Sequence, residues 1–188
     1  MRIISGSFRS RTLQAPPGLA TRPTSDRLRE TLFNVLAPRI EGTTFLDLYA
    51  GSGAVGIEAL SRGAAGVAFV ERAPAALKTL EGNLARLGLT AGFRVHASSV
   101  SAFLRKAGRG VEAGFDLVFL DPPYDAAQEY AATLGLLGGT GVGLLAAGAL
   151  VIAEHRRKER LADSYGLLER TRLLEQGDAS LSFYAVLS

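Results

Sequence analysis

The chain has 188 residues, a net charge of +3 and no cysteine, so it fits one domain and excludes disulfides, thiolate metal sites and a cysteine nucleophile. Apolar residues make up 47% of it, which is enough for a sizeable core. Since no apolar stretch has the length of a membrane span or the form of a signal peptide, we expect a cytoplasmic protein.

The positive charge is concentrated at the N-terminus. Residues 1–39 hold seven arginines and only two acidic residues, a net charge of +5, whereas the rest of the chain sums to about −2. Arginine pairs with phosphate groups and stacks on bases better than lysine does, so this segment is a candidate nucleic-acid contact. A solvated basic surface is the alternative interpretation.

Residues 1–13 contain two short runs around a glycine and predict a small hairpin. Helix-start residues at 23–26 then predict a helix that Pro38 ends. The helix has an apolar face at helical spacing, formed by Leu28, Leu32, Val35 and Leu36. The opposite face carries the charged residues Arg27, Arg29 and Glu30, which we expect to be exposed.

Beyond residue 43, buried-strand patterns alternate with helical patterns. The expected strands are 44–49, 67–70, 93–96, 115–120 and 149–153. The expected helices are 55–62, 73–87, 100–106 and 126–137. Two late runs, 167–173 and 180–187, predict an antiparallel hairpin at the sheet edge. The alternation indicates an α/β, doubly wound, mostly parallel sheet, in which ligands bind at the carboxyl ends of the strands.

The first of these strands ends in a glycine loop, Gly51-Ser52-Gly53-Ala54-Val55-Gly56, which matches the pattern G-x-G-x-x-G. About 20 residues later Glu71 ends the next strand, where an acid binds ribose hydroxyls. These features indicate an adenosine-containing cofactor. Asp47 precedes the loop, where its charge would repel the pyrophosphate of NAD and attract the ammonium of a methionine moiety. Asp47 therefore favours S-adenosylmethionine.

The fourth strand ends in Asp121-Pro122-Pro123-Tyr124, the most specific pattern in the chain. The prolines stiffen the backbone and remove two N–H donors, so the segment offers a carboxylate and a carbonyl as acceptors. A pair of acceptors can grip an –NH₂ group and orient its lone pair, and Tyr124 can stack on a base. We expect direct methyl transfer to such an amine.

These residues resemble the class I methyltransferases that modify amino nitrogens. The segment Arg22-Pro23-Thr24-Ser25-Asp26-Arg27-Leu28-Arg29-Glu30-Thr31-Leu32-Phe33-Asn34-Val35-Leu36 narrows the resemblance to the bacterial 16S ribosomal RNA (guanine-N2)-methyltransferases, the RsmD-type family. The resemblance covers roughly residues 2–155. It implies a seven-stranded Rossmann-like methyltransferase domain at 40–188 with a C-terminal antiparallel edge strand, preceded by an RNA-binding hairpin and helix extension at 1–39.

The resemblance also implies a set of site residues. Those expected at the reaction are Asp121, Pro122, Pro123 and Tyr124. Those expected to hold S-adenosyl-L-methionine are Asp47, Tyr49, Ala50, Gly51, Ser52, Gly53, Glu71, Arg72, Ser98, Ser99, Val100 and Asp121. Those expected at RNA are Arg2, Arg9, Arg11, Arg22, Thr24 and Arg27. Two positions depart from the family pattern: Ser99 stands where an acid or amide commonly contacts adenine, and Ser10 stands in place of a hairpin glycine.

The expected partner is small-subunit ribosomal RNA, free or within the subunit, and we expect a monomer with no metal. His96 and His155 are expected to be structural, and the charge run 154–160 to be a solvated face that can touch RNA. Asn83 lies on the second helix of the core, and its two alternative roles are ordinary hydrogen bonding and a part in the site. The alternatives are an adenine-N6 methyltransferase, an NAD-dependent oxidoreductase and a non-catalytic RNA-binding protein.

Overall fold

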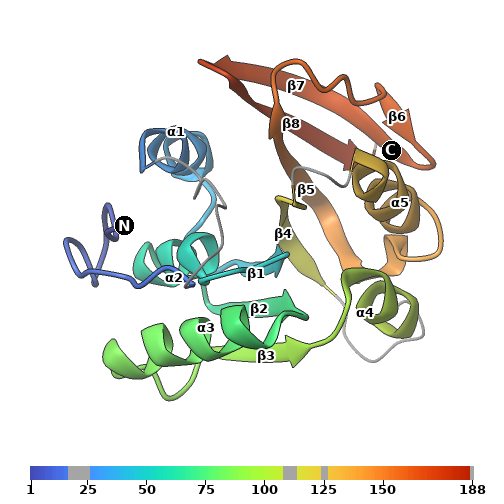
Figure 1. Ribbon diagram of the computed structural model, residues 1–188. Helices are drawn as coiled ribbons and strands as arrows, with labels where there is room; N and C mark the ends of the chain where they lie inside the picture. The colour runs from blue at the N-terminus through green and yellow to red at the C-terminus, as the bar shows by residue number, and fades with distance from the viewer. Residues whose placement is uncertain (17–25, 108–113, 124–126, 187–188) are drawn as a thin grey trace.

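A computed structural model describes residues 1–16, 26–107, 114–123 and 127–186, and a single mixed sheet lies at its centre (Figure 1). The strands lie in the order β3-β2-β1-β4-β5-β8-β7-β6. Their bounds are β1 Thr44–Leu48, β2 Gly66–Glu71, β3 Phe93–Ala97, β4 Phe115–Leu120, β5 Leu145–Arg156, β6 Ser164–Tyr165, β7 Leu168–Gln176 and β8 Ala179–Val186.

The sheet is parallel from β3 to β5 and antiparallel from β8 to β6. The expected fold class is confirmed, with eight strands in the described residues instead of seven because the two-residue β6 extends the edge. β5 is longer than expected, since it continues to Arg156 where β8 pairs with it. β4 ends at Leu120, opposite Ala153, so β5 extends past it.

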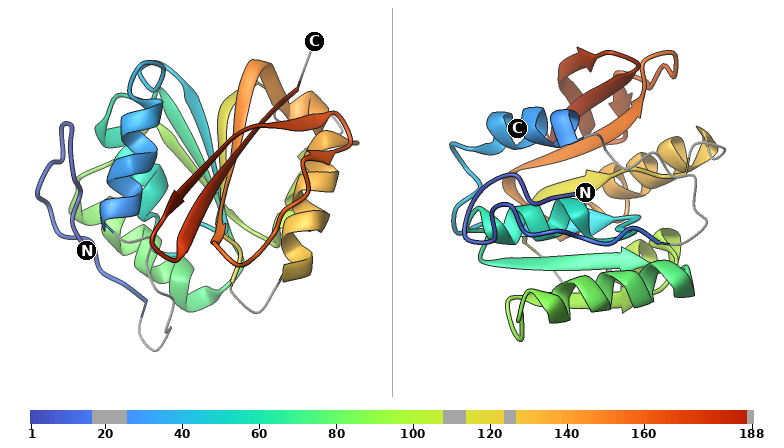
Figure 2. Two further views of the ribbon diagram at one scale, coloured as in Figure 1. Left: turned by 90° about the horizontal axis from the view of Figure 1, so that it is seen from above. Right: turned by 60° about the vertical axis from the view of Figure 1, so that its left-hand side comes forward.

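Helices cover both faces of the sheet. Their bounds are α1 Asp26–Leu36, α2 Ala54–Ser61, α3 Pro74–Arg86, α4 Val100–Ala107 and α5 Ala127–Gly138, with a short 3₁₀ turn at Val142–Leu144. Alternate strand residues point to opposite faces, so Phe45 packs in one core with α1, α2 and α3, while Leu46 packs in another with α4 and α5. In the left view of Figure 2, α1 (blue) and α5 (gold) lie on opposite sides of the C-terminal strands.

The N-terminal segment packs beside α2 (Figure 2, right). A bridge between Arg2 and Thr12 forms the expected hairpin, although the strands are shorter than the pattern suggested. Ser10 has a φ of 68°, in the left-handed region where the family pattern has glycine. Ile3 and Leu13 of the N-terminal segment pack in the same core as Phe45 of β1. The expected division into an extension at 1–39 and a domain at 40–188 stays a prediction.

One expectation for the N-terminal segment is wrong: Arg29 is fully buried. Its guanidinium donates to the Arg2 carbonyl and to Asp26 Oδ1 (3.0 Å), and it lies 3.8 Å from the buried Glu58 of α2. Glu58 also accepts bonds from the backbone of residues 4 and 5 and from Arg62. The hairpin covers this face of α1, which makes it interior. No helix within the described ranges is long and apolar enough to cross a bilayer.

Candidate active site

The candidate site lies at the carboxyl ends of β1, β2, β4 and β5. Leu48 is level with Val70 and Leu120, and Leu120 is level with Ala153. The residues that follow these positions therefore meet at one edge of the sheet. This register brings together the glycine loop, Glu71 and Asp121, as the sequence predicts.

The glycine loop is a tight turn between β1 and α2. Gly51 and Gly53 have φ angles of 57° and 78°, and the Gly53 N–H donates to the Ala50 carbonyl (2.7 Å). A Cβ added to Gly56 would stand 2.3 Å from the Phe69 ring, so this glycine permits close packing of α2 on β2. The sequence pattern therefore has its usual physical basis in this chain.

Glu71 holds the loop in place. Its Oε2 accepts a hydrogen bond from the Gly51 N–H (2.9 Å), and its Oε1 accepts from the N–H groups of Arg72 (2.7 Å) and Ala73 (2.8 Å). One carboxylate thus connects the glycine loop to the start of α3. Its expected contact with ribose stays a prediction.

Asp47 is 1% exposed and supports the loop from below. Its Oδ2 accepts from the Gly56 N–H (2.9 Å), which fixes the start of α2 against β1. Burial raises the pKa of Asp47 to about 8; the Gly56 hydrogen bond lowers it in part, and the charge of Glu71 raises it further. A contact between Asp47 and a ligand ammonium stays a prediction.

Asp121 is half-buried directly after β4. Its pKa lies well above the usual range because of burial, with further contributions from the charges of Glu154 and Asp47. Strand alternation places these three side chains on the same face, each two residues after a member of the same core cluster. Glu154 was not expected at this edge, although it follows the strand expected at 149–153 much as Asp121 follows the strand at 115–120.

The two prolines after Asp121 differ in exposure: Pro122 is buried and Pro123 is exposed. Neither has an N–H, so this stretch of backbone presents carbonyls alone. Tyr124 lies outside the described residues, and its expected stacking role stays a prediction.

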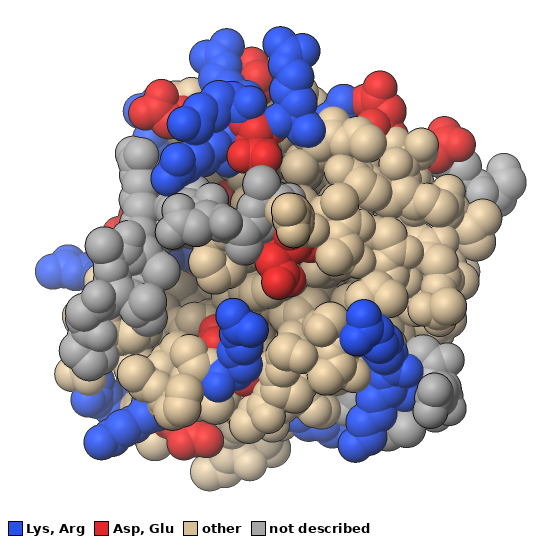
Figure 3. Space-filling view, turned by 45° about the vertical axis from the view of Figure 1, so that its right-hand side comes forward, with Lys and Arg blue, Asp and Glu red and all other residues tan. Residues whose placement is uncertain are grey.

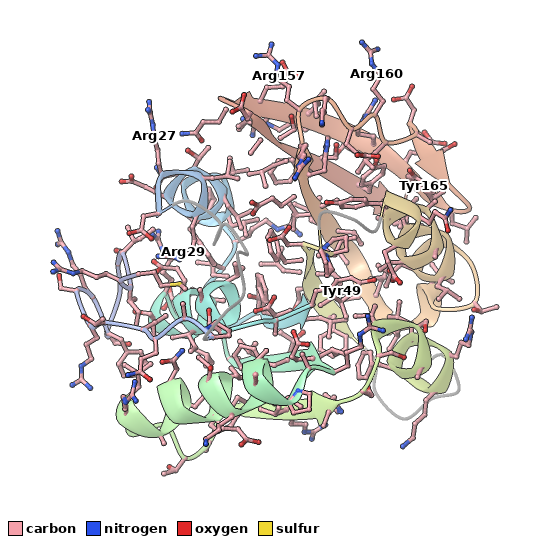
Figure 4. The ribbon with its side chains drawn as sticks, in the orientation of Figure 1. Arg27, Arg29, Tyr49, Arg157, Arg160 and Tyr165 are labelled. Carbon is pink, nitrogen blue, oxygen red and sulfur yellow. The ribbon has the colours of Figure 1, made fainter. Side chains whose placement is uncertain are left out.

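Tyr49 connects the glycine loop to α5, and Figure 4 labels it near the centre of the molecule. Its hydroxyl donates to Glu129 Oε2 (2.8 Å) and lies 2.7 Å from Thr133 Oγ1. Its backbone φ of 61° is rare for a non-glycine residue and indicates local strain. The expected cofactor contact of Tyr49 stays a prediction, and its two partners on α5 follow from no local pattern because they lie 80 and 84 positions away.

The residues after β3 form the start of α4. The Ser98 N–H donates to the Glu71 carbonyl (3.0 Å), which joins this turn to the end of β2. Ser99 Oγ accepts from the Ala102 N–H (3.2 Å), so this hydroxyl caps the helix, and Val100 is buried at its first position. Adenine contacts for these residues stay predictions.

Of the two alternative roles of Asn83, the structure shows hydrogen bonding that holds the backbone in place. This buried side chain donates to the carbonyls of Ser52 (2.9 Å) and Gln14 (3.1 Å), and it accepts from the Gln14 N–H (2.9 Å). It therefore attaches the N-terminal segment to the glycine loop. His155 is also held structurally, with Nε2 2.9 Å from Ser182 Oγ, and burial lowers its pKa.

The expected RNA contacts are exposed where the structure describes them. Arg2, Arg9, Arg11 and Arg27 are all exposed, while Arg22 and Thr24 lie outside the described residues. Figure 4 shows Arg27 projecting from α1. The hairpin tip packs on the C-terminal end of α2, where Ser7 donates its N–H to the Ser61 carbonyl (2.8 Å). RNA contact by these residues stays a prediction.

Comparison with known proteins places the chain in a family. The family model described as "Conserved hypothetical protein 95" matches residues 1–185. The curated protein "Putative rRNA methyltransferase YlbH" of Bacillus subtilis is 40% identical over 184 residues, 98% of either chain. "Ribosomal RNA small subunit methyltransferase D" of Escherichia coli is 46% identical over 124 residues, which cover 66% of this chain and 60% of that protein.

Solved structures have the same fold along the whole chain. The structure titled "Putative methyltransferase yhhF" from Escherichia coli is 36% identical, covers 98% of this chain and 96% of its own, and has a TM-score of 0.83. Together with the family model, this full-length match shows that the chain belongs to the Conserved hypothetical protein 95 family, the RsmD-type family that the sequence motifs resemble.

Proposed function

We propose that this protein transfers a methyl group from S-adenosyl-L-methionine to the exocyclic N2 amino group of a guanine in small-subunit ribosomal RNA. One observation carries the proposal: Asp121 and its prolines, the glycine loop and Glu71 meet at one edge of the sheet. The chain is also similar along its full length to the protein named "Putative rRNA methyltransferase YlbH".

The charges at this edge support a cationic cofactor. Burial raises the pKa of Asp47 and of Asp121, with the charge of Glu71 adding to the first and the charges of Glu154 and Asp47 adding to the second. A positive ligand would relieve this repulsion, whereas the pyrophosphate of NAD would add to it. The sulfonium and ammonium groups of S-adenosyl-L-methionine therefore fit the residues present. When bound, this cofactor supplies an activated methyl group.

The residues that follow β4 would bind and orient the amine that receives the methyl group. The amine can donate its two hydrogens to the Asp121 carboxylate and to a carbonyl of the stiff proline segment, which orients its lone pair. The nitrogen gains a methyl group and must lose a proton. A carboxylate with a raised pKa is a stronger proton acceptor than an ordinary aspartate, so Asp121 suits this role.

The RNA substrate is inferred from the relatives and from the charge of the N-terminal segment. The exposed arginines at positions 2, 9, 11 and 27 can pair with phosphates. Guanine N2 as the target rests on the resemblance to the RsmD-type family, and adenine N6 is the alternative that the same acceptor pair could hold.

Two measurements test the proposal. Calorimetric titration should give binding of S-adenosyl-L-methionine and none of NADH. A tritiated-methyl transfer assay on unmodified small-subunit ribosomal RNA and on unmodified small subunits should then label one guanine, identified as N2-methylguanine by digestion and mass spectrometry. Labelled adenine would replace the proposed target, and NADH binding without S-adenosyl-L-methionine binding would overturn the enzyme class.

A further inference from the structure

The charge run at residues 154–160 is not wholly solvated as expected, because Glu154 and His155 are buried on β5. The loop after β5 carries residues 157–160 of the run, for which the proposed function has no use. Residues of this loop and of β5, β7 and β8 line a depression of about 390 Å³, and the charged side chains of its lining are Arg157, Arg160 and Arg170 together with Glu159, Asp163 and Glu175. Ser180 lies in the lining, and its buried Oγ has no hydrogen-bond partner within the described part of the chain. This part of the surface is therefore concave and lined by polar side chains.

The loop is held rigidly. The Ala162 carbonyl accepts from the Tyr184 hydroxyl (2.8 Å), and the Ala162 N–H donates to the Tyr165 hydroxyl (3.0 Å). Arg170 donates to the Leu161 carbonyl (3.2 Å) and to Asp163. At the other end, the Arg157 N–H donates to the Asp178 carbonyl (2.8 Å). A loop fixed at both ends needs little further ordering of its backbone on binding, so the main ordering cost is that of its exposed side chains.

Three exposed cations project from this loop, and we call Arg157, Lys158 and Arg160 the basic rim. Arg157 pairs with Glu175 of β7 (3.1 Å), with the two side chains 60% and 41% exposed. Within the described ranges Arg160 has no ion-pair partner. An exposed pair is held by about 1 kcal/mol or less, so a phosphate can compete for Arg157. Arg160 can take a phosphate without losing an existing contact.

The basic rim lies beside the candidate active site. Glu154 follows Ala153 and is level with Asp121, and Arg157 comes three residues later, about 10 Å further along the strand direction. Figure 3 shows Lys and Arg side chains gathered at the top with Asp and Glu side chains among them, and further acidic side chains in the hollowed centre below. Figure 4 places Arg157 and Arg160 at that upper end.

We propose that the basic rim binds the RNA phosphate backbone next to the target base. This inference rests on the proposed function, because it needs an RNA substrate at the neighbouring edge. A strand whose base enters the crevice at Asp121 has its flanking phosphates outside, and an arginine fork matches a phosphate group. RNA then contacts the enzyme on two sides of the crevice, through the N-terminal arginines and through the basic rim.

The test measures affinity for a transcript of unmodified small-subunit ribosomal RNA by filter binding, between about 50 and 200 mM salt. Arg157→Gln/Arg160→Gln should weaken binding several-fold and reduce the salt slope by about 2, one for each lost phosphate contact. Glu175→Gln should tighten binding, because it frees Arg157 from its acidic partner. Lys78→Gln/Arg86→Gln on the exposed surface of α3 removes the same charge and should leave the slope close to that of the wild type.

Titration of S-adenosyl-L-methionine separates the two proposals. Wild-type protein that binds the cofactor but neither the transcript nor unmodified small subunits overturns the proposed substrate and this inference together. If wild-type protein binds and methylates RNA while neither the rim variant nor Glu175→Gln changes RNA affinity, only this inference is overturned. A rim variant that binds naked RNA normally but methylates assembled subunits poorly would indicate contact with a ribosomal protein and would also overturn it.

Discussion

Ionisable side chains are placed differently in the parallel and antiparallel parts of the sheet. At the carboxyl ends of β1 and β4, Asp47 is buried and Asp121 is half-buried, and the pKa values of both are raised. On β7, Glu175 is 41% exposed and paired with an arginine. Burial makes a charge costly, so the raised pKa values mark the parallel edge as a candidate binding site, whereas the outward charges suit contact with a hydrated polyanion.

The largest expected effect follows removal of the acid at the end of β4. Asp121→Ala should lower methyl transfer about 100-fold or more, since both the grip on the amine and the proton acceptor are lost. Affinity for S-adenosyl-L-methionine should stay within a few-fold, as measured by calorimetry. Wild-type turnover in this variant would show that the parallel edge does not hold the reacting amine.

A second large effect is expected where a buried charge already has its partners. Glu58→Gln leaves Arg29 buried with a weaker partner, so the free energy of unfolding in urea should fall by about 3–5 kcal/mol. Glu81→Gln on the exposed surface of α3 is the matched control and should change it by less than about 0.5 kcal/mol. Equal effects in the two variants would contradict the proposed importance of burial.

The pH dependence of stability tests the buried state of Asp47. Its folded pKa of about 8 exceeds its ordinary value of 3.8, so the folded protein retains a proton that the unfolded chain releases. The contribution of this group to stability is therefore greatest below pH 3.8 and declines as the pH rises towards about 8.

Asp47→Asn should remove this decline, which is at most about 1.4 kcal/mol per pH unit for one proton. Urea unfolding without cofactor, at about pH 5.5 and about pH 7.5, measures it within the window that the shifted pKa defines. The same slope in the variant and the wild type would mean that the carboxyl of Asp47 titrates normally. Saturating S-adenosyl-L-methionine should also flatten the wild-type slope if its positive charge lies nearby.

The contrast between the two parts of the sheet also explains what the sequence could predict. The parallel edge was predictable because strand periodicity and glycine spacing are local, so Gly51, Glu71 and Asp121 could be assigned to one edge by topology. The burial of Arg29 was not predictable from the sequence, because it depends on a hairpin that packs across α1. The bonds between Tyr49 and α5 also escaped, since they join distant segments and follow no local pattern. Glu154 was assigned to a solvated charge run, although its place after the expected fifth strand matches that of Asp121 after the fourth.

The smallest expected effect concerns the exposed pair of Arg157 and Glu175. Its atoms are 3.1 Å apart, close to the distance at Asp26 and Arg29, yet both side chains are open to water. Glu175→Gln should therefore change the free energy of unfolding by less than about 1 kcal/mol while it tightens RNA binding. A loss of several kcal/mol in urea would mean that the pair holds the C-terminal strands together, and the difference between the two parts of the sheet would then lie in strand direction instead of burial.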